Sequence, residues 1–268
     1  MKLFFISLIS CTIFVSCEID KKLIVENTDI PLISKVLIAG ESYYEYSYND
    51  ANLISEEKSK FHYTKHTYND SNLLKTSDFY MDPAMFSSSS IIIETAMNRT
   101  EWVNPDNTEK SLSKTFEYNS KEQLIRITLS RPSVSNSEYS EFIYENDRIS
   151  RQTNYWKNEI SGYIDYLYDE KGNVIKRIKY MVPSTGIAEL ITTTEFEYDI
   201  MRNPYQSFKR LMDPGKYTNQ NNITKEIYTF HFEVDPLTEN VHITENSYDY
   251  NDKGYPIRVN GEAEYVYK

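Results

Sequence analysis

The four histidines are the side chains whose spacing comes closest to metal chemistry. His62 and His66 form a His-x-x-x-His pair, which on a helix would direct both rings at one metal ion. The residues around them are mostly tyrosine and threonine, which favour a strand instead. Four residues along a strand span about 13 Å, too far for two rings to share an ion. We therefore predict that this pair does not ligate a metal.

A second histidine pair is distant along the chain but would meet across a hairpin. If the chain turns at Pro236-Leu237, His231 and His242 lie directly opposite each other, at a distance that side chains bridge. The alternative is an exposed cross-strand pair, because a stable zinc site usually has three or four ligands. We predict no metal here either.

The sequence carries no recognisable catalytic motif. It lacks a phosphate-binding loop, a dinucleotide-binding glycine pattern and a serine-hydrolase elbow. Its 40 acidic residues are accounted for by solvated strand faces and turn caps. None of the Asp/Asn turns has the alternating acidic loop, ending in glutamate, that binds calcium. We therefore expect a protein that is not an enzyme and that has no cofactor.

The two tryptophans, Trp102 and Trp156, are the candidate ligand-binding residues. Flat aromatic faces stack well on sugar rings, so an exposed indole favours a glycan ligand. The alternative role for both rings is packing between neighbouring strands. A protein partner would instead use a sheet edge or a broad apolar patch. The exposure of the two rings discriminates between these alternatives.

A short phrase recurs along the chain: an aromatic residue, any residue, tyrosine, then Asn or Asp and a polar turn. Alternation with period two followed by a turn indicates a β-hairpin, and its recurrence predicts a repeat architecture. In two copies a glycine, Gly172 or Gly254, stands where a type I turn with a bulge needs a left-handed residue. The repeating tyrosines are Tyr48, Tyr68, Tyr118, Tyr144, Tyr168, Tyr198 and Tyr250.

These repeats predict an all-β fold: a long, curled antiparallel sheet built as a meander of hairpins. Two long gaps between repeat tyrosines are each expected to hide one degenerate hairpin, the second around Asp235-Pro236. The total of about 14 to 18 strands exceeds the ~10 at which twisted open sheets curl or split. Tyrosine outnumbers phenylalanine 24 to 12, which suits a mostly single-layered sheet with a wet face. Residues 202–224 lack alternation and are expected to form an excursion with a short helix at 205–212.

The N-terminus has the pattern of a secretion signal over residues 1–16. Lys2 precedes an uncharged, mostly apolar run shorter than the ~20 residues of a membrane-spanning helix. The run ends at Phe14-Val15-Ser16-Cys17, which resembles the lipobox of bacterial lipoproteins. The resemblance implies that Cys17 carries the lipid and attaches the chain to a membrane. We expect a lipidated tether at 17–35 and a single domain at 36–268.

The charge pattern argues against a nucleic-acid partner. The full chain has a net charge of −11, and removing Lys2 with the signal leaves −12. Lysine and arginine are scattered rather than gathered into a basic stripe, as phosphate-backbone binding requires.

The repeated phrase resembles the tyrosine–aspartate repeats of Rhs-type shells. It is more similar to a group of Bacteroidetes lipoproteins of unknown function that carry the same phrase. The most similar part begins at Phe196-Glu-Tyr198-Asp199 and continues through Asn203-Pro204-Tyr205 to residues 221–224. The resemblance covers residues 40–268. It implies a lipoprotein at the outer membrane, on its cell-surface or periplasmic side, without catalytic residues. We expect a binding or scaffolding surface for a protein partner, with a glycan-binding surface lipoprotein as the alternative.

Overall fold

The computed structural model describes residues 30–81, 102–132, 134–232 and 240–268. The chain divides into two units, residues 1–30 and residues 31–268, and the second contains all the described strands. Cys17 and the predicted signal lie outside the described residues. The first strand begins at Ile33, inside the segment expected to be a tether, because Ile33 is fully buried and pairs with Tyr267 near the C-terminus.

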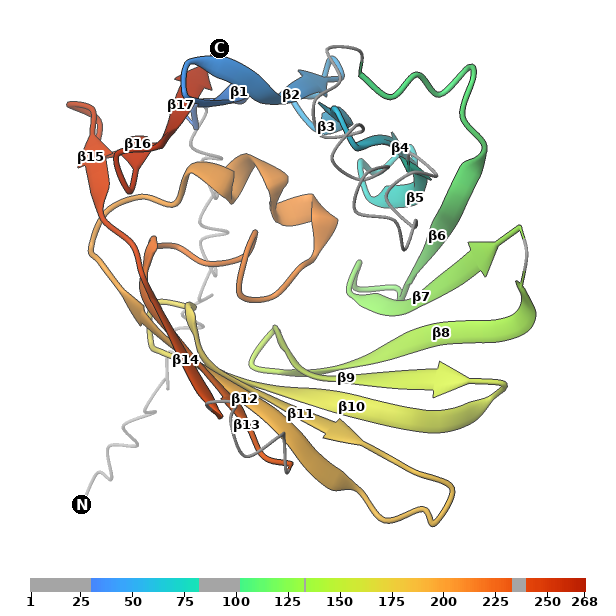
Figure 1. Ribbon diagram of the computed structural model, residues 1–268. Coiled ribbons are helices and arrows are strands. Elements are labelled where there is room, and N and C mark those ends of the chain that lie inside the picture. Colours follow the sequence, from blue (N-terminus) through green and yellow to red (C-terminus); the bar gives the residue numbers. More distant parts are fainter. Residues whose placement is uncertain (1–29, 82–101, 133, 233–239) are drawn as a thin grey trace, which may run out of the picture. The chain divides into compact units, whose positions relative to one another are not determined.

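Seventeen antiparallel strands form one sheet, which confirms the predicted all-β fold (Figure 1). They are β1 (Ile33–Ile38), β2 (Glu41–Tyr48), β3 (Ile54–Ser59), β4 (His62–Tyr68), β5 (Leu74–Met81), β6 (Lys110–Tyr118), β7 (Leu124–Arg131), β8 (Val134–Glu145), β9 (Arg148–Trp156), β10 (Glu159–Tyr168), β11 (Val174–Met181), β12 (Glu189–Tyr198), β13 (Ile223–Phe230), β14 (Val241–Glu245), β15 (Tyr248–Tyr250), β16 (Pro256–Val259) and β17 (Ala263–Tyr267).

The sheet is a meander that curls strongly (Figure 1). Each strand from β1 to β13 pairs with the next one along the chain. β17 returns to the free edge of β1, and β16 and β15 follow it. In the described residues no ladder joins β14 to β15, so the sheet is not closed. A sheet this long curls because the twist of successive strands accumulates.

The seven repeat tyrosines occupy equivalent positions, as predicted. Each sits at the end of its strand and pairs, across a bulge, with an apolar residue at the start of the returning strand. The pairs are Tyr48–Ile54, Tyr68–Leu74, Tyr118–Leu124, Tyr144–Ile149, Tyr168–Val174, Tyr198–Ile223 and Tyr250–Pro256. Of these partners only Ile223 is half-buried rather than buried.

The turn after each tyrosine explains the Asn or Asp of the phrase. In the first copy, Oδ1 of Asn49 accepts hydrogen bonds from the backbone N–H groups of Ala51 and Leu53, each at 3.0 Å. The turn then needs a left-handed residue, which is Asn52 (φ 56°) here and Gly172 (φ 97°) in a later copy. Each turn is therefore stabilised by its own residues: one side chain caps the backbone N–H groups, and one residue adopts the positive φ that the turn requires.

The tyrosine hydroxyls form a ladder that links neighbouring hairpins. Each donates a hydrogen bond to the carbonyl at the start of an earlier returning strand: Tyr48 to Ile33, Tyr68 to Ile54, Tyr118 to Leu74, Tyr168 to Ile149, Tyr198 to Val174, Tyr248 to Ile223 and Tyr267 to Pro256. A phenylalanine ring would fill the same space without this bond, so the ladder explains the excess of tyrosine.

Two repeat tyrosines depart from the ladder. The Tyr144 hydroxyl lies towards the Leu124 carbonyl, but among the described residues it has no partner in hydrogen-bond geometry. Tyr250 donates instead to the carboxylate of Asp199, and Tyr248 takes its place in the ladder. Asp199 begins the excursion, so the exception at Tyr250 arises where the regular hairpin is interrupted.

The excursion is a long insertion in the turn between β12 and β13, residues 199–222. Oδ1 of Asp199 accepts from the N–H groups of Met201 at its start and Asn222 at its end, at 2.9 and 3.1 Å. The insertion contains the short helix expected at 205–212, which is a 3₁₀ helix, η2, and lies one residue earlier, at Pro204–Leu211. This helix lies inside the curve of the sheet (Figure 1).

A buried amide network ties the insertion to the β10–β11 turn. Oδ1 of Asn173 accepts from the N–H groups of Gln220 and Asn221, at 2.8 and 3.0 Å. Oδ1 of Asn219 accepts from the N–H of Val174 at 3.1 Å. Asn173 and Asn219 are almost wholly buried, so these bonds are shielded from water. The network fixes the insertion over the concave face.

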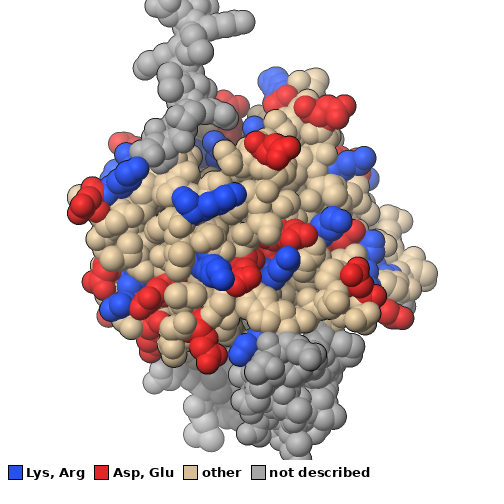
Figure 2. All heavy atoms as spheres, turned by 90° about the horizontal axis from the view of Figure 1, so that it is seen from above, with Lys and Arg blue, Asp and Glu red and all other residues tan. Residues whose placement is uncertain are grey.

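The core lies on the same concave face, below the insertion. Its buried members are Leu74, Phe116, Leu124, Phe142, Ile149, Tyr166, Val174 and Phe196. Leu211 and Met212 of the insertion pack against this cluster. The convex face is wet, and on the side shown in Figure 2 acidic and basic side chains are interspersed. The sheet is therefore mostly single-layered, as predicted.

The structure differs between the two long gaps in the repeat, each expected to contain a hairpin. Between Tyr198 and Tyr250 the expected hairpin is present as β13 and β14. Between Tyr68 and Tyr118, β5 pairs directly with β6, and residues 82–101 of the connection lie outside the described residues. Within the described segments, no helix has the length and apolarity to cross a membrane.

Candidate functional site

An open cavity of about 520 Å³ lies between the concave face of the sheet and the insertion. Its walls come from strands β3 to β10, and Leu211 to Pro214 and Tyr217 of the insertion cover one side. The volume falls within the ~300–1,000 Å³ range typical of small-molecule sites. We call it the concave cavity.

The floor of the concave cavity is a row of side chains on adjacent strands, the cavity row. Register places its members directly opposite one another: His66 (β4), Ser77 (β5), Lys114 (β6), Leu129 (β7), Glu138 (β8) and Trp156 (β9). Cross-strand partners share a face, so all six side chains point to the same side of the sheet. All six line the cavity.

A second line of polar groups runs beside the cavity row. The Oδ1 of Asn154 accepts hydrogen bonds from Ser140 Oγ and Gln152 Nε2, both at 2.8 Å. Gln152 in turn accepts from the Tyr166 hydroxyl at 3.2 Å. Within the described residues the Asn154 side-chain N–H groups have no partner, so they remain available to a ligand in the cavity.

The pKa values of the ionisable groups in the cavity are shifted because the surrounding protein restricts their hydration. Burial lowers the pKa of His66 to about 4, and its Nδ1 lies 2.8 Å from Ser77 Oγ. Burial also lowers the pKa of Lys114, whose Nζ lies 5.1 Å from the centre of the Phe79 ring. Asp213, on the insertion, is open to water through the cavity, yet the surrounding protein limits its hydration and raises the pKa of its carboxyl. His66 is therefore neutral at physiological pH.

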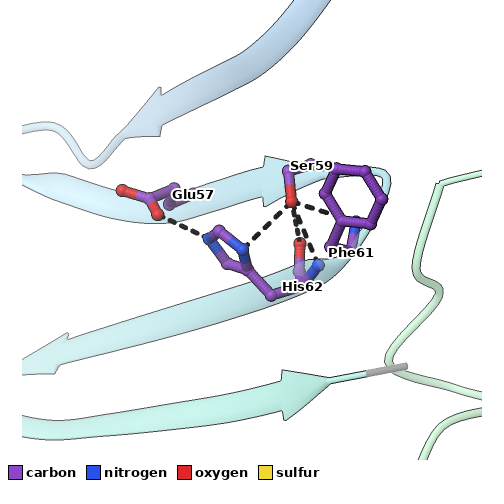
Figure 3. Close-up of polar contacts among 4 residues, drawn as sticks. All are labelled: Glu57, Ser59, Phe61 and His62. Carbon is purple, nitrogen blue, oxygen red and sulfur yellow. Dashed lines mark hydrogen bonds and ion pairs between the residues drawn. The ribbon is translucent and has the colours of Figure 1, made fainter. Parts of the chain in front are cut away.

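His62, the partner of His66 in the first predicted pair, is engaged within its own hairpin (Figure 3). Its Nε2 lies 2.6 Å from Oε1 of Glu57, and its Nδ1 lies 3.0 Å from Oγ of Ser59. Both histidines are on strand β4, as the flanking residues predicted, and have separate partners. In the described part of the chain, no three His, Cys, Asp or Glu side chains are grouped as a metal site.

The expected alignment of the second histidine pair is wrong. His242 pairs with Tyr228, and His231 lies beyond the end of β13, where its Nε2 is 3.0 Å from the Thr193 hydroxyl. Cross-strand pairs such as Ile227–Ile243 set this register, which is displaced by three residues from the register that a turn at Pro236-Leu237 would give. The loop tip, residues 233–239, lies outside the described residues.

The two tryptophans lie in different environments. Trp156 ends β9 and is 40% exposed at the concave cavity. Trp102 is half-buried beside a shallow, open surface formed with Glu41, Lys58 and Lys60. The structure therefore places only Trp156 in the concave cavity.

Several cavity residues were not identified from the sequence: Lys114, Glu138, Asn154 and Asp213. A usable signal was present for two of them. Lys114 and Asn154 lie on strands in which period-two alternation assigns faces, and Lys114 is two residues before the buried Phe116. Asp213 lies in the insertion, where no such periodicity applies.

Comparisons with known proteins do not give this chain a family. No family description matches it, and no curated protein matches it. Two solved porin-like proteins are similar to it: one from Bacteroides uniformis ATCC 8492 (12% identity, TM-score 0.43, covering 88% of this chain and 96% of that chain) and one from Bacteroides vulgatus ATCC 8482 (11% identity, TM-score 0.40, covering 89% and 99%).

The TcdB2-TccC3 structure also matches, with 12% identity and a TM-score of 0.31. The match covers 83% of this chain but 10% of that one, so the chain spans about a tenth of its length. Similarities at this level do not assign a function.

Proposed function

We propose that this chain is a non-enzymatic, lipid-anchored protein of the outer membrane that acts as a binding surface, with the concave cavity as its binding site. The observation that supports this is the cavity itself, in which an exposed indole and unpaired polar groups face one open space of about 520 Å³. Pockets that combine aromatic surface with a few hydrogen-bonding groups are the usual form of a ligand site.

Trp156 favours a glycan as the ligand. Its ring is available for stacking on a sugar, and Asn154 and Glu138 beside it carry groups that hydrogen-bond to hydroxyls. Trp102 borders a space of similar volume, about 550 Å³, but that space is a shallow surface open to solvent rather than an enclosed cavity. The alternative within this proposal is that the sheet binds a protein partner as a scaffold, which requires no small ligand in the cavity.

The anchor is supported by the residues before Cys17, which resemble a lipobox. The substitution Cys17→Ser removes the acylated thiol, so the variant is expected to move from the membrane fraction to a soluble fraction. The measurement is cell fractionation with a carbonate wash, with wild-type protein as the reference. Retention of Cys17→Ser in washed membranes would show that another element holds the chain there.

Glycan binding is tested with full-length protein, solubilised in detergent, on a glycan array. Wild-type protein is expected to retain a defined set of glycans. Trp156→Ala should weaken their binding about tenfold or more, because truncating a central tryptophan commonly removes over 1 kcal/mol of binding free energy. Trp102→Ala is the matched control and should bind normally.

Three outcomes contradict parts of this proposal. Equal losses for both tryptophan variants would remove Trp156 from the site. Absence of glycan binding, together with a specific protein crosslinked on intact cells, would leave only the scaffolding form. Hydrolysis of any glycan on the array would refute a non-enzymatic role.

A further inference from the structure

The charged members of the cavity row are not equivalent. Glu138 is paired with Arg131, whose guanidinium contacts both carboxylate oxygens. Lys114 lies two strands away in the same row, and within the described residues no carboxylate comes within ion-pair distance of its Nζ. Among the described residues its Nζ lies over the face of the Phe79 ring, and the Asp213 carboxylate acts on it electrostatically from beyond ion-pair distance. Lys114 is thus the unpaired cation of the cavity.

Another lysine on the same strand shows what the usual arrangement is. Lys110 begins β6 on the open surface, and its Nζ lies 3.3 Å from the carboxylate of Asp78. Of the 15 lysines and arginines in the described strands, eight have such a cross-strand carboxylate partner. Lys114 points inward, where a charge loses hydration and is stabilised only by a partner. Within the described residues Asp213 acts on Lys114 electrostatically but forms no ion pair with it, which leaves a direct partner to be supplied by a ligand.

The groups around Lys114 restrict which anion would fit. Glu57, Glu138 and Asp213 also line the cavity, so its summed field opposes a strongly charged anion. A phosphate carries about −1.5 to −2 at neutral pH, whereas a carboxylate carries a single charge. Ser77 and the neutral His66 lie beside Lys114 in the row and offer hydrogen bonds without adding charge. A singly charged carboxylate is therefore favoured.

The length of the row sets the size of the ligand. Lys114 on β6 and Trp156 on β9 are three strand spacings apart, about 14 Å at ~4.8 Å each. This is longer than one sugar ring. A ligand that lies along the row from Lys114 to Trp156 is therefore longer than a monosaccharide, which favours an oligosaccharide.

From these observations we infer that the concave cavity binds an acidic oligosaccharide, whose carboxylate pairs with Lys114 while a sugar ring stacks on Trp156. The inference rests on the proposed glycan-binding function and specifies its ligand class. Lys114 supplies selectivity for the acid, and Trp156 supplies affinity for the ring.

The test uses an array that presents uronic- and sialic-acid oligosaccharides beside neutral counterparts in which the carboxylate is replaced by a hydroxymethyl group. Full-length protein should prefer the acidic member of a pair, and titration calorimetry on that pair should give at least a tenfold difference. Lys114→Met keeps the aliphatic stem and removes the charge. It should weaken acidic binding about ten- to hundredfold and leave neutral binding unchanged, because charged hydrogen bonds contribute ~1.5–3 kcal/mol.

Lys110→Met is the matched control and should bind both members as the wild type does. Equal affinity of wild-type protein for acidic and neutral members would overturn the inference while leaving glycan binding intact. Equal loss of both members in a Lys114→Met variant with an unchanged melting temperature would overturn it too. If no glycan of either kind binds, the proposed glycan function fails and the inference fails with it.

Discussion

Replacing Phe208 by alanine is expected to lower the free energy of unfolding by about 3–5 kcal/mol, the usual range for a buried phenylalanine. Phe208 is fully buried in η2 and is surrounded by aromatic rings. Its ring centre lies 5.0 Å from Tyr46 on β2 and 5.6 Å from Tyr217 in the insertion. The truncation would leave a cavity between the insertion and the sheet, and urea unfolding followed by tyrosine fluorescence measures the loss.

Phe232→Ala is the matched control, because Phe232 is 43% exposed. Its effect should stay within ~0.5 kcal/mol, as for most surface substitutions. A small effect of Phe208→Ala, equal to that of the control, would show that the insertion is not anchored through this ring. Ligand binding should fall together with stability in Phe208→Ala, since the same insertion covers the concave cavity.

The repeat architecture could be predicted from the sequence because each hairpin is specified locally. The Tyr-Asn and Tyr-Asp phrases place a strand end, a capped turn and a left-handed residue within about six positions. Asn49 and Gly172 perform these roles without help from distant residues. One turn position was unexpected: Glu122 adopts φ 61°, where glycine or asparagine stands in other copies.

The site could not be predicted because it depends on register across many strands. Lys114 and Trp156 are placed on one face of the sheet by the three ladders that join β6 to β9, and each of these ladders contains a bulge. A one-residue slip in any of them would move a side chain to the opposite face. The His231–His242 pair illustrates the problem: no local sequence pattern fixes the register of β13 and β14, and the two histidines are not opposite each other. The insertion adds Asp213 through a buried amide network that has no sequence period.

Acidification is expected to destabilise the protein through His66. Its imidazole is 8% exposed, and burial lowers its pKa from an ordinary 6.5 to about 4. Burial is the largest cause of this lowering; the nearby Lys114 contributes to it, and Glu57 opposes it. Between these two pH values the unfolded chain binds the proton and the folded chain does not, so stability falls as pH decreases. At 1.36 kcal/mol per pH unit, the full effect is roughly 3 kcal/mol.

The variant His66→Gln isolates this contribution, because it retains a hydrogen-bonding group opposite Ser77 but does not titrate. Carboxylates also titrate in acid, but they are common to both proteins and cancel in the comparison. Urea unfolding of each protein at pH 7.5 and at pH 4.5 gives two stability differences. The wild-type difference should exceed that of His66→Gln by 2–3 kcal/mol, on the order of the linkage value. If the free energy of unfolding falls equally in the two proteins, His66 takes up a proton within the folded cavity. The adjacent Glu57 would then have to stabilise the charged imidazole.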